Sequence, residues 1–230
     1  MKYKGGSVVA TASGSVGGLT MSRNRYGQYI RIRAIPTKVS NENTMSARAR
    51  LIQVSQAWGL LTSAQQRAWA VYADSAPITD ALGDKQVLTP HAAYVQINAR
   101  VVLAGGTILT APPSAAAPPS LTACTGTWDI GAGTSTLAYT VTPLAANHCL
   151  YVQAAVLIKP GQRYWKNRIK LVKVSAAALA SPYDWQADTE SRFGALVIGQ
   201  RVVLLASVLD KTTGLISAPA IEEGVVVSTV

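Results

Sequence analysis

The chain has 230 residues, of which 49% are hydrophobic and 14% are charged. This composition supports one large folded domain or two small ones and argues against a long disordered chain. No apolar run approaches the roughly 20 residues that a membrane-spanning helix needs, and the two cysteines are too few for a disulfide scaffold. No apolar segment follows the first lysines, so we expect neither a signal peptide nor a membrane partner.

The net charge of +10 is concentrated at the N-terminal end. Residues 1–58 contain nine Lys or Arg and a single acid, Glu42, which gives +8. Residues 59–110 are neutral and residues 111–230 carry +2. A basic segment of this kind indicates an anionic partner, either nucleic acid or the acidic face of another protein.

The first 42 residues are predicted to be an extended basic arm that ends in a short strand. Residues 1–22 are rich in Gly, Ser, Thr and Val without helical periodicity, which is typical of a segment that becomes ordered on a partner. In residues 25–33, Ile30 and Ile32 alternate with Arg31 and Arg33, so a strand with one apolar and one cationic side is expected.

Residues 43–110 show helical periodicity and predict a module of three helices. Asn43 or Thr44 can cap a first helix that runs to about residue 60. Thr62 followed by Gln65 fits a capping box for a second helix, and the sequence Thr89-Pro90 begins a third. The predicted core of this module consists of four aromatic residues, Trp58, Trp69, Tyr72 and Tyr94.

Residues 111–120 form a Pro/Ala-rich linker, and residues 121–230 have the pattern of a β domain. Short apolar segments are separated by turns that contain glycine, as in an immunoglobulin- or fibronectin-like sandwich. The predicted fold is therefore α+β and multidomain, with the basic arm and strand, the three-helix module and a C-terminal β-sandwich. The six predicted strands are 121–128, 136–142, 149–158, 169–174, 196–208 and 220–227.

Residue patterns typical of catalysis or metal binding do not occur in the sequence, so we expect no enzyme activity, cofactor or metal. The two histidines, His91 and His148, lie in different predicted domains. Cys124 and Cys149 are expected to be free thiols. An acidic cluster at 184–190 is expected to be a solvated loop rather than a pair of catalytic carboxylates.

The arginines of the N-terminal segment are the best candidate for a functional site. Arginine and tyrosine can grip phosphates and stack on bases, or they can fill pockets on a neighbouring protein subunit. The glycines and β-branched residues around them favour strand addition to a partner protein. A second basic group at 159–173 is expected to be a solvated face or a docking edge. The candidate partner-binding residues are Arg23, Arg25, Tyr26, Tyr29, Arg31, Arg33, Arg48 and Arg50.

Several short motifs in the first 110 residues resemble a group of uncharacterised structural proteins of tailed-bacteriophage virions. The motifs are Gly14-x-x-Gly17, then Arg23-Asn24-Arg25-Tyr26-Gly27-Gln28-Tyr29-x-Arg31-x-Arg33-x-x-Pro36, Asn43-Thr44 with Arg48 or Arg50, Trp58-x-x-Leu61-Thr62-x-x-Gln65-x-x-Ala68-Trp69, and Tyr94-x-x-x-Asn98 with Gly105 and the prolines that follow. The usual pattern has an Asn-Pro-x-Thr step after the arginine-rich strand, whereas residues 39–44 here lack the proline. The resemblance covers somewhat under half of the chain.

The resemblance implies a non-enzymatic virion component that is made in the host cytoplasm. We expect a capsid cement or decoration protein that docks on other virion proteins, the major capsid or the neck and tail subunits, and that is a homo-oligomer in the particle. A neck, connector or tail-ring component is one alternative. A nucleic-acid-binding protein that contacts DNA through residues 1–58 is the second.

Overall fold

The computed structural model describes residues 2–3, 13–24, 27–33, 41–79, 84–131, 135–140 and 142–228. The chain divides into two compact units, an N-terminal unit of Met1–Met45 and a C-terminal unit of Ser46–Val230. The architecture is mixed, with four α-helices and several antiparallel sheets in the described part of the chain. The α+β class expected from the sequence is confirmed at this level.

The N-terminal unit contains a four-stranded antiparallel sheet where the sequence predicted an extended arm and one strand. Its strands, in the order β1-β4-β3-β2, are β1 (Lys2–Tyr3), β2 (Gly14–Val16), β3 (Leu19–Asn24) and β4 (Gly27–Ile32). A tight turn at Gly17-Gly18 joins β2 to β3, and Gly17 has a φ of 56°, which favours glycine. Gly17 and Gly18, which were read as part of an extended arm, therefore form a hairpin turn.

Three helices follow, α1 (Glu42–Trp58), α2 (Ser63–Ser75) and α3 (Pro90–Leu103). The capping box of α2 is present, because the Gln65 amide donates to the Thr62 hydroxyl at 3.3 Å and the Thr62 amide donates to the Gln65 side chain at 2.9 Å. Thr89 caps α3 as predicted. The cap of α1 is Asn41 and not Asn43 or Thr44, since its side chain accepts from the Thr44 amide at 2.9 Å.

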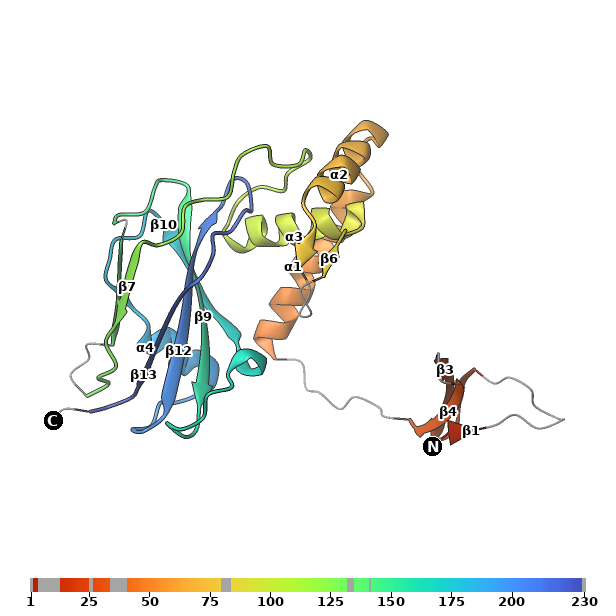
Figure 1. The fold of residues 1–230 in the computed structure, drawn as a ribbon. Helices are drawn as coiled ribbons and strands as arrows, with labels where there is room; N and C mark the ends of the chain where they lie inside the picture. Colours follow the sequence, from red (N-terminus) through yellow and green to blue (C-terminus); the bar gives the residue numbers. More distant parts are fainter. Residues whose placement is uncertain are drawn as a thin grey trace. The chain divides into compact units, whose positions relative to one another are not determined.

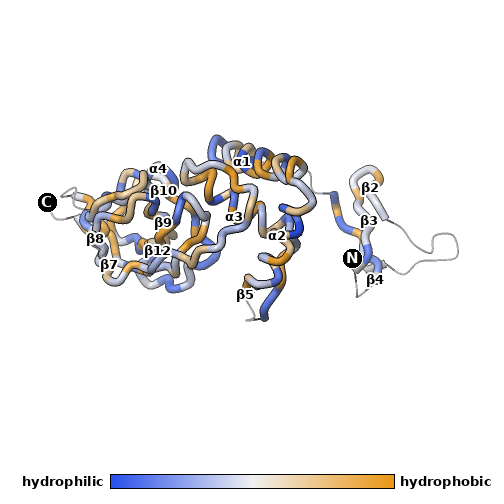
Figure 2. Tube along the Cα trace, turned by 90° about the horizontal axis from the view of Figure 1, so that it is seen from above, coloured by the Kyte–Doolittle hydropathy of each residue, from blue (hydrophilic) through white to orange (hydrophobic). Residues whose placement is uncertain are grey.

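The aromatic residues of the helices meet on Tyr94 of α3. Trp58 and Trp69 belong to the core as predicted, and the ring of each lies 5.2 Å from the ring of Tyr94. Trp69 and Tyr94 are fully buried, and Trp58 and Tyr72 are partly buried against the same cluster. Figure 2 shows hydrophilic and hydrophobic residues alternating along α1, α2 and α3, as expected of helices with one buried face. A short hairpin of β5 (Ile78–Thr79) and β6 (Lys85–Gln86) separates α2 from α3.

Two antiparallel sheets form the rest of the C-terminal unit (Figure 1). We call this part the two-sheet region. Its three-stranded sheet has the order β11-β8-β7 and its four-stranded sheet has the order β10-β9-β12-β13. The strands are β7 (Ala123–Gly126), β8 (Thr136–Thr140), β9 (His148–Leu157), β10 (Lys170–Ala177), β11 (Tyr183–Asp184), β12 (Arg201–Asp210) and β13 (Ala220–Val225).

The main hydrophobic core lies between the two sheets. Leu137 and Tyr139 of β8 share one cluster with alternate residues of β9 and β12, such as Leu150 and Leu204. The other face of the four-stranded sheet is also covered, because Trp165 and Ile169 pack against Val203 and its neighbours. These two residues flank a short 3-10 helix, η1 (Lys166–Arg168). Strand β12 is consequently apolar over nearly its whole length, as strands buried on both faces are.

The acidic cluster that was expected to be a solvated loop is a structured part of the core wall. Helix α4 (Gln186–Phe193) follows the fully buried Trp185, whose indole donates to the Thr127 carbonyl at 3.1 Å. Asp188 on this helix pairs with Lys173 at 2.8 Å and accepts the Tyr183 hydroxyl at 2.7 Å. The Asp188 carboxylate therefore joins α4 to β10 and β11.

The helices pack directly on the two-sheet region within the C-terminal unit, because Leu215 after β12 belongs to the cluster of Ile97 and Val101 on α3. The segment that follows α3 is tied down by buried Asn98, which accepts from the Leu109 amide at 2.6 Å, and by Trp69, which donates to the Thr110 carbonyl at 3.1 Å. Residues 111–120 contain neither helix nor strand, as expected of a linker, but Pro118 within them is buried. The segment expected to separate two domains therefore runs inside one compact unit.

Candidate docking surface

The register of the N-terminal sheet sorts its side chains onto two different faces. Residues opposite one another on neighbouring strands share a face, and successive residues of a strand alternate between faces. The hydroxyls of Ser15 and Thr20, which are register partners, lie 2.9 Å apart and so mark one face. We call this the cationic face; the pairings place on it Ser15, Thr20, Ser22, Tyr29 and Arg31.

The opposite face of the same sheet is apolar. The pairs Val16–Leu19, Leu19–Ile32 and Met21–Ile30 place these five side chains together, and we call this the apolar face. Arg23 and Gln28 are paired at its end, next to the β3–β4 turn. Sequence analysis found the alternation in β4 but missed the contribution of β2 and β3. The Gly-Gly pair between two short β-prone segments was the available signal for that hairpin.

The cationic face has no acid with which to neutralise its charge. Arg31 and Arg33 are exposed, and Arg33 continues the alternation because its amide donates to the Gly18 carbonyl at 2.8 Å. The first acidic residue of the chain is Glu42, whereas residues 1–41 contain seven Lys or Arg. An anion that satisfies these guanidinium groups must come from outside the segment.

The remaining candidate residues are placed less uniformly. Arg25 and Tyr26 lie outside the described residues. Arg48 and Arg50 belong to α1 and to the C-terminal unit, so they are not part of the sheet. Arg48 is exposed, whereas Arg50 is partly buried. Burial raises the pKa of the Tyr151 phenol, and the nearby charge of Arg50 opposes this effect in part.

The second basic group is anchored in part. Lys173 pairs with Asp188, and Lys170 lies over the Phe193 ring with its ammonium 4.6 Å from the ring centre. The other cations of the group are exposed on the segment between β9 and β10. Tyr164 in this segment is exposed as well.

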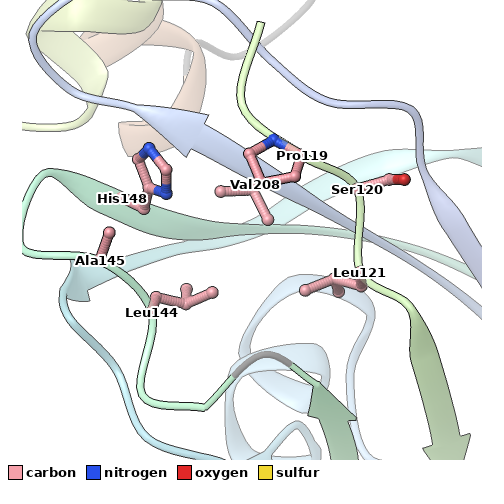
Figure 3. A pocket seen from close by; sticks show the side chains of 7 residues that line it. All are labelled: Pro119, Ser120, Leu121, Leu144, Ala145, His148 and Val208. Atoms are coloured by element: carbon pink, nitrogen blue, oxygen red, sulfur yellow. The ribbon is translucent and has the colours of Figure 1, made fainter.

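An apolar pocket of about 150 Å³ lies in the two-sheet region, at the end of β9 where His148 begins the strand (Figure 3). Leu121, Leu144 and Val208 line it together with Pro119, and His148 is the one ionisable side chain among the lining residues. One imidazole beside aliphatic carbons does not form a general acid–base pair, so the pocket offers space for an aliphatic group and no catalytic constellation.

The cysteines are free in the structure. Burial raises the pKa of the Cys124 thiol to about 11, with the charge of Glu222 adding to the effect, and burial also raises the pKa of Cys149. Both sulfurs are therefore protonated near neutral pH and are poor nucleophiles.

Within the described ranges, no cluster of three or more metal-ligating side chains occurs. Over the same residues, no helix is both long and apolar enough to span a bilayer. Comparison with known proteins found no matching family model, no similar curated protein and no similar solved structure. The sheet with its two unlike faces is consequently the surface on which we base a function.

Proposed function

We propose that this chain is a non-enzymatic structural protein of a tailed-bacteriophage virion, made in the host cytoplasm, and that its N-terminal sheet docks on acidic subunits of the particle. The observation that carries the proposal is the cationic face. Arg31 and Arg33 project from a sheet that contains no acid of its own. A capsid cement or decoration protein fits best, because most of the net charge lies at one end of the chain and the rest is a folded body.

We infer further that the two-sheet region is an immunoglobulin- or fibronectin-like sandwich. Its first, second and fifth strands (β7, β8 and β11) form one sheet, and the other four form the second. Immunoglobulin constant domains divide their strands into ABED and CFG sheets. The strand order of the two-sheet region differs from that arrangement in one strand. The fourth strand, β10, pairs with the third, β9, and does not join the sheet of β7, β8 and β11.

Protein docking is favoured over nucleic-acid binding by the rest of the sheet. Binding of single-stranded nucleic acid combines cations with aromatic platforms, and Tyr29 is the one aromatic side chain assigned to the cationic face among the described residues. Hydroxyl side chains and arginine, which make up the remainder, suit hydrogen bonding to the carboxylates and backbone of a protein partner.

The proposal is tested by the copy number of this protein in purified particles, measured by quantitative mass spectrometry against the major capsid protein. Hundreds of copies support cement or decoration. Six, twelve or a small multiple place the protein at the neck or tail, the first alternative. Absence from the particle refutes the virion proposal and leaves the second alternative, DNA binding through residues 1–58.

Variants test the docking surface itself. Replacing Arg31 and Arg33 by Gln should strongly reduce loading onto particles that lack the protein, and removing residues 1–35 should abolish it. The control replaces Lys166 and Arg168 by Gln, which removes the same charge from an exposed part of the C-terminal unit. Full loading of the truncated chain refutes docking through the sheet. If the affinity instead falls by about one log unit per phosphate contact for each tenfold rise in salt concentration, the partner is nucleic acid.

A further inference from the structure

The apolar face of the N-terminal sheet is exposed to an unusual degree. Ile32 is 81% exposed, Val16 is 74% exposed and Leu19 is 45% exposed, although they adjoin one another in the register. Met21 and Ile30, at the centre of the face, are only partly buried. A contiguous apolar patch on three neighbouring strands marks a surface that another layer covers.

The described part of the N-terminal unit supplies no such layer. Every fully buried apolar residue of the described chain belongs to residues 54–226. A sheet needs a second layer against its apolar side in order to exclude water from it. The described residues of this unit therefore leave the face uncovered, and the charges around the face indicate the chemistry of a partner that would cover it.

We propose that the apolar face packs against the same face of a second copy of this chain. The arginines favour this partner, because Arg31 and Arg33 belong to the opposite face and would point away from the interface. Among the described residues, Arg23 is the one cation on the apolar face, and it lies toward one end. A two-fold axis that crosses the strands at Met21 separates the two copies of Arg23 by about 13 Å along the strands, the length of four strand residues.

A partner of other chemistry suits this face less well. An acidic surface is attracted to the cationic face and gains nothing from five aliphatic or thioether side chains. A self-complementary pairing buries those side chains without burying an unpaired charge. The cationic faces of both copies then point outwards, where they remain available for docking.

The interface has a limited area. Four strands about 4.8 Å apart and six residues of about 3.3 Å each cover at most about 400 Å² per copy, half of the roughly 800 Å² per partner of a standard interface. The dimer is consequently weak in dilute solution and forms as concentration rises. On a particle, where many copies lie close together, the same contact is strengthened by local concentration.

The experiment is sedimentation of the full chain over a range of concentrations up to the millimolar region. Leu19→Lys and Thr20→Lys are the matched variants, since they add the same charge to neighbouring positions of β3 on opposite faces. Leu19→Lys should weaken self-association at least about tenfold, because it buries an unpaired ammonium group, and Thr20→Lys should change it less than about threefold. A wild-type chain that stays monomeric throughout, or two variants with equal effects, overturns the proposal.

Cross-linking gives a second measurement that does not require loss of binding. The two variants are Met21→Cys, at the centre of the apolar face, and Ser22→Cys, on the cationic face. Under mild oxidation Met21→Cys should give a disulfide-linked dimer, whereas Ser22→Cys should not. The wild-type chain is the blank, because the native thiols have raised pKa values and react slowly. Equal cross-linking of both variants, or of neither, contradicts the proposed face.

The proposed dimer does not depend on the proposed function, and the effect of salt concentration tests the two separately. Both sheets are basic, so salt screens their repulsion and should strengthen the dimer. Docking on an acidic subunit should weaken under the same change. A dimer that dissociates at high salt contradicts the apolar contact, and loading that salt does not affect contradicts the cationic docking.

Discussion

Replacement of Gly214 by alanine probes the contact between the helices and the two-sheet region. Gly214 lies in the turn after β12 and has a φ of 69°. A Cβ at this position would lie 2.6 Å from the Ile97 carbonyl oxygen and 2.9 Å from a methyl group of Val101, both on α3. The backbone oxygen cannot rotate away, so the turn and α3 must move apart.

Two costs add in this variant. An alanine in the left-handed region costs about 1–2 kcal/mol, and overpacking a tight contact costs about 1–3 kcal/mol more. Gly105→Ala is the matched control, because its φ of 75° is similar while a Cβ there meets nothing within 4 Å. We expect Gly214→Ala to lose about 2–5 kcal/mol of unfolding free energy and Gly105→Ala only about 1–2 kcal/mol.

The assay is urea unfolding followed by tryptophan fluorescence, with both variants compared with the wild-type chain. The difference between the two variants isolates the steric contact with α3. If Gly105→Ala and Gly214→Ala lose the same stability within about 0.5 kcal/mol, the turn does not press on α3 and the packing argument fails.

Two further outcomes concern stability. Asn98→Ala should lower the free energy of unfolding by about 2–4 kcal/mol, because it leaves the Leu109 amide and carbonyl without their partner. The control, Asn167→Ala at an exposed position, should cost under about 0.5 kcal/mol. Equal losses in the two variants would contradict this role for Asn98. The second is alkaline loss of stability. Burial raises the pKa of Cys124 to about 11, so the fold favours the neutral thiol. The resulting stability is complete below the ordinary thiol pKa of about 8.5 and is lost as pH rises through about 11. Cys124→Ala should flatten the unfolding free energy over that range of pH, and an unchanged slope would refute the assignment.

Local signals in the sequence were sufficient for α1, α2 and α3 and for the long strands of residues 121–230. The capping box at Thr62 and Gln65 and the Thr89-Pro90 start depend on residues within one turn, so the sequence carries them completely. The central strands β9 and β12 are long apolar segments bounded by turns, which is why the β pattern of residues 121–230 was readable.

Elements whose stability comes from distant contacts were not predicted. Helix α4 is short and polar, with Thr189 as its one buried residue, and bonds from Asp188 to Lys173 and Tyr183 hold it in place. The Pro/Ala segment was interpreted as a spacer because nothing local shows that Asn98 and Trp69 fix the chain just before it. In both cases at least one of the stabilising hydrogen bonds joins residues that are more than ten positions apart in the sequence.

The candidate site was predicted in its chemistry and missed in its geometry. The alternation of Ile30 and Ile32 with Arg31 and Arg33 predicted two unlike sides of one strand, and β4 has them. The glycine-rich residues before it did not suggest strands, because glycine has low strand propensity and marks a hairpin only when its flanks are read together. The apolar face, which needs all three strands, therefore emerged only from the register.

The contact between the Gly214 turn and α3 has a mechanical consequence. Bending between the helices and the sheets requires the Gly214 turn to slide on α3, because this turn meets Ile97 and Leu215 beside it packs in the cluster of α3. The contact of this turn with α3 therefore resists flexing at the junction. A force on the end of β12 is passed to α3 through the turn.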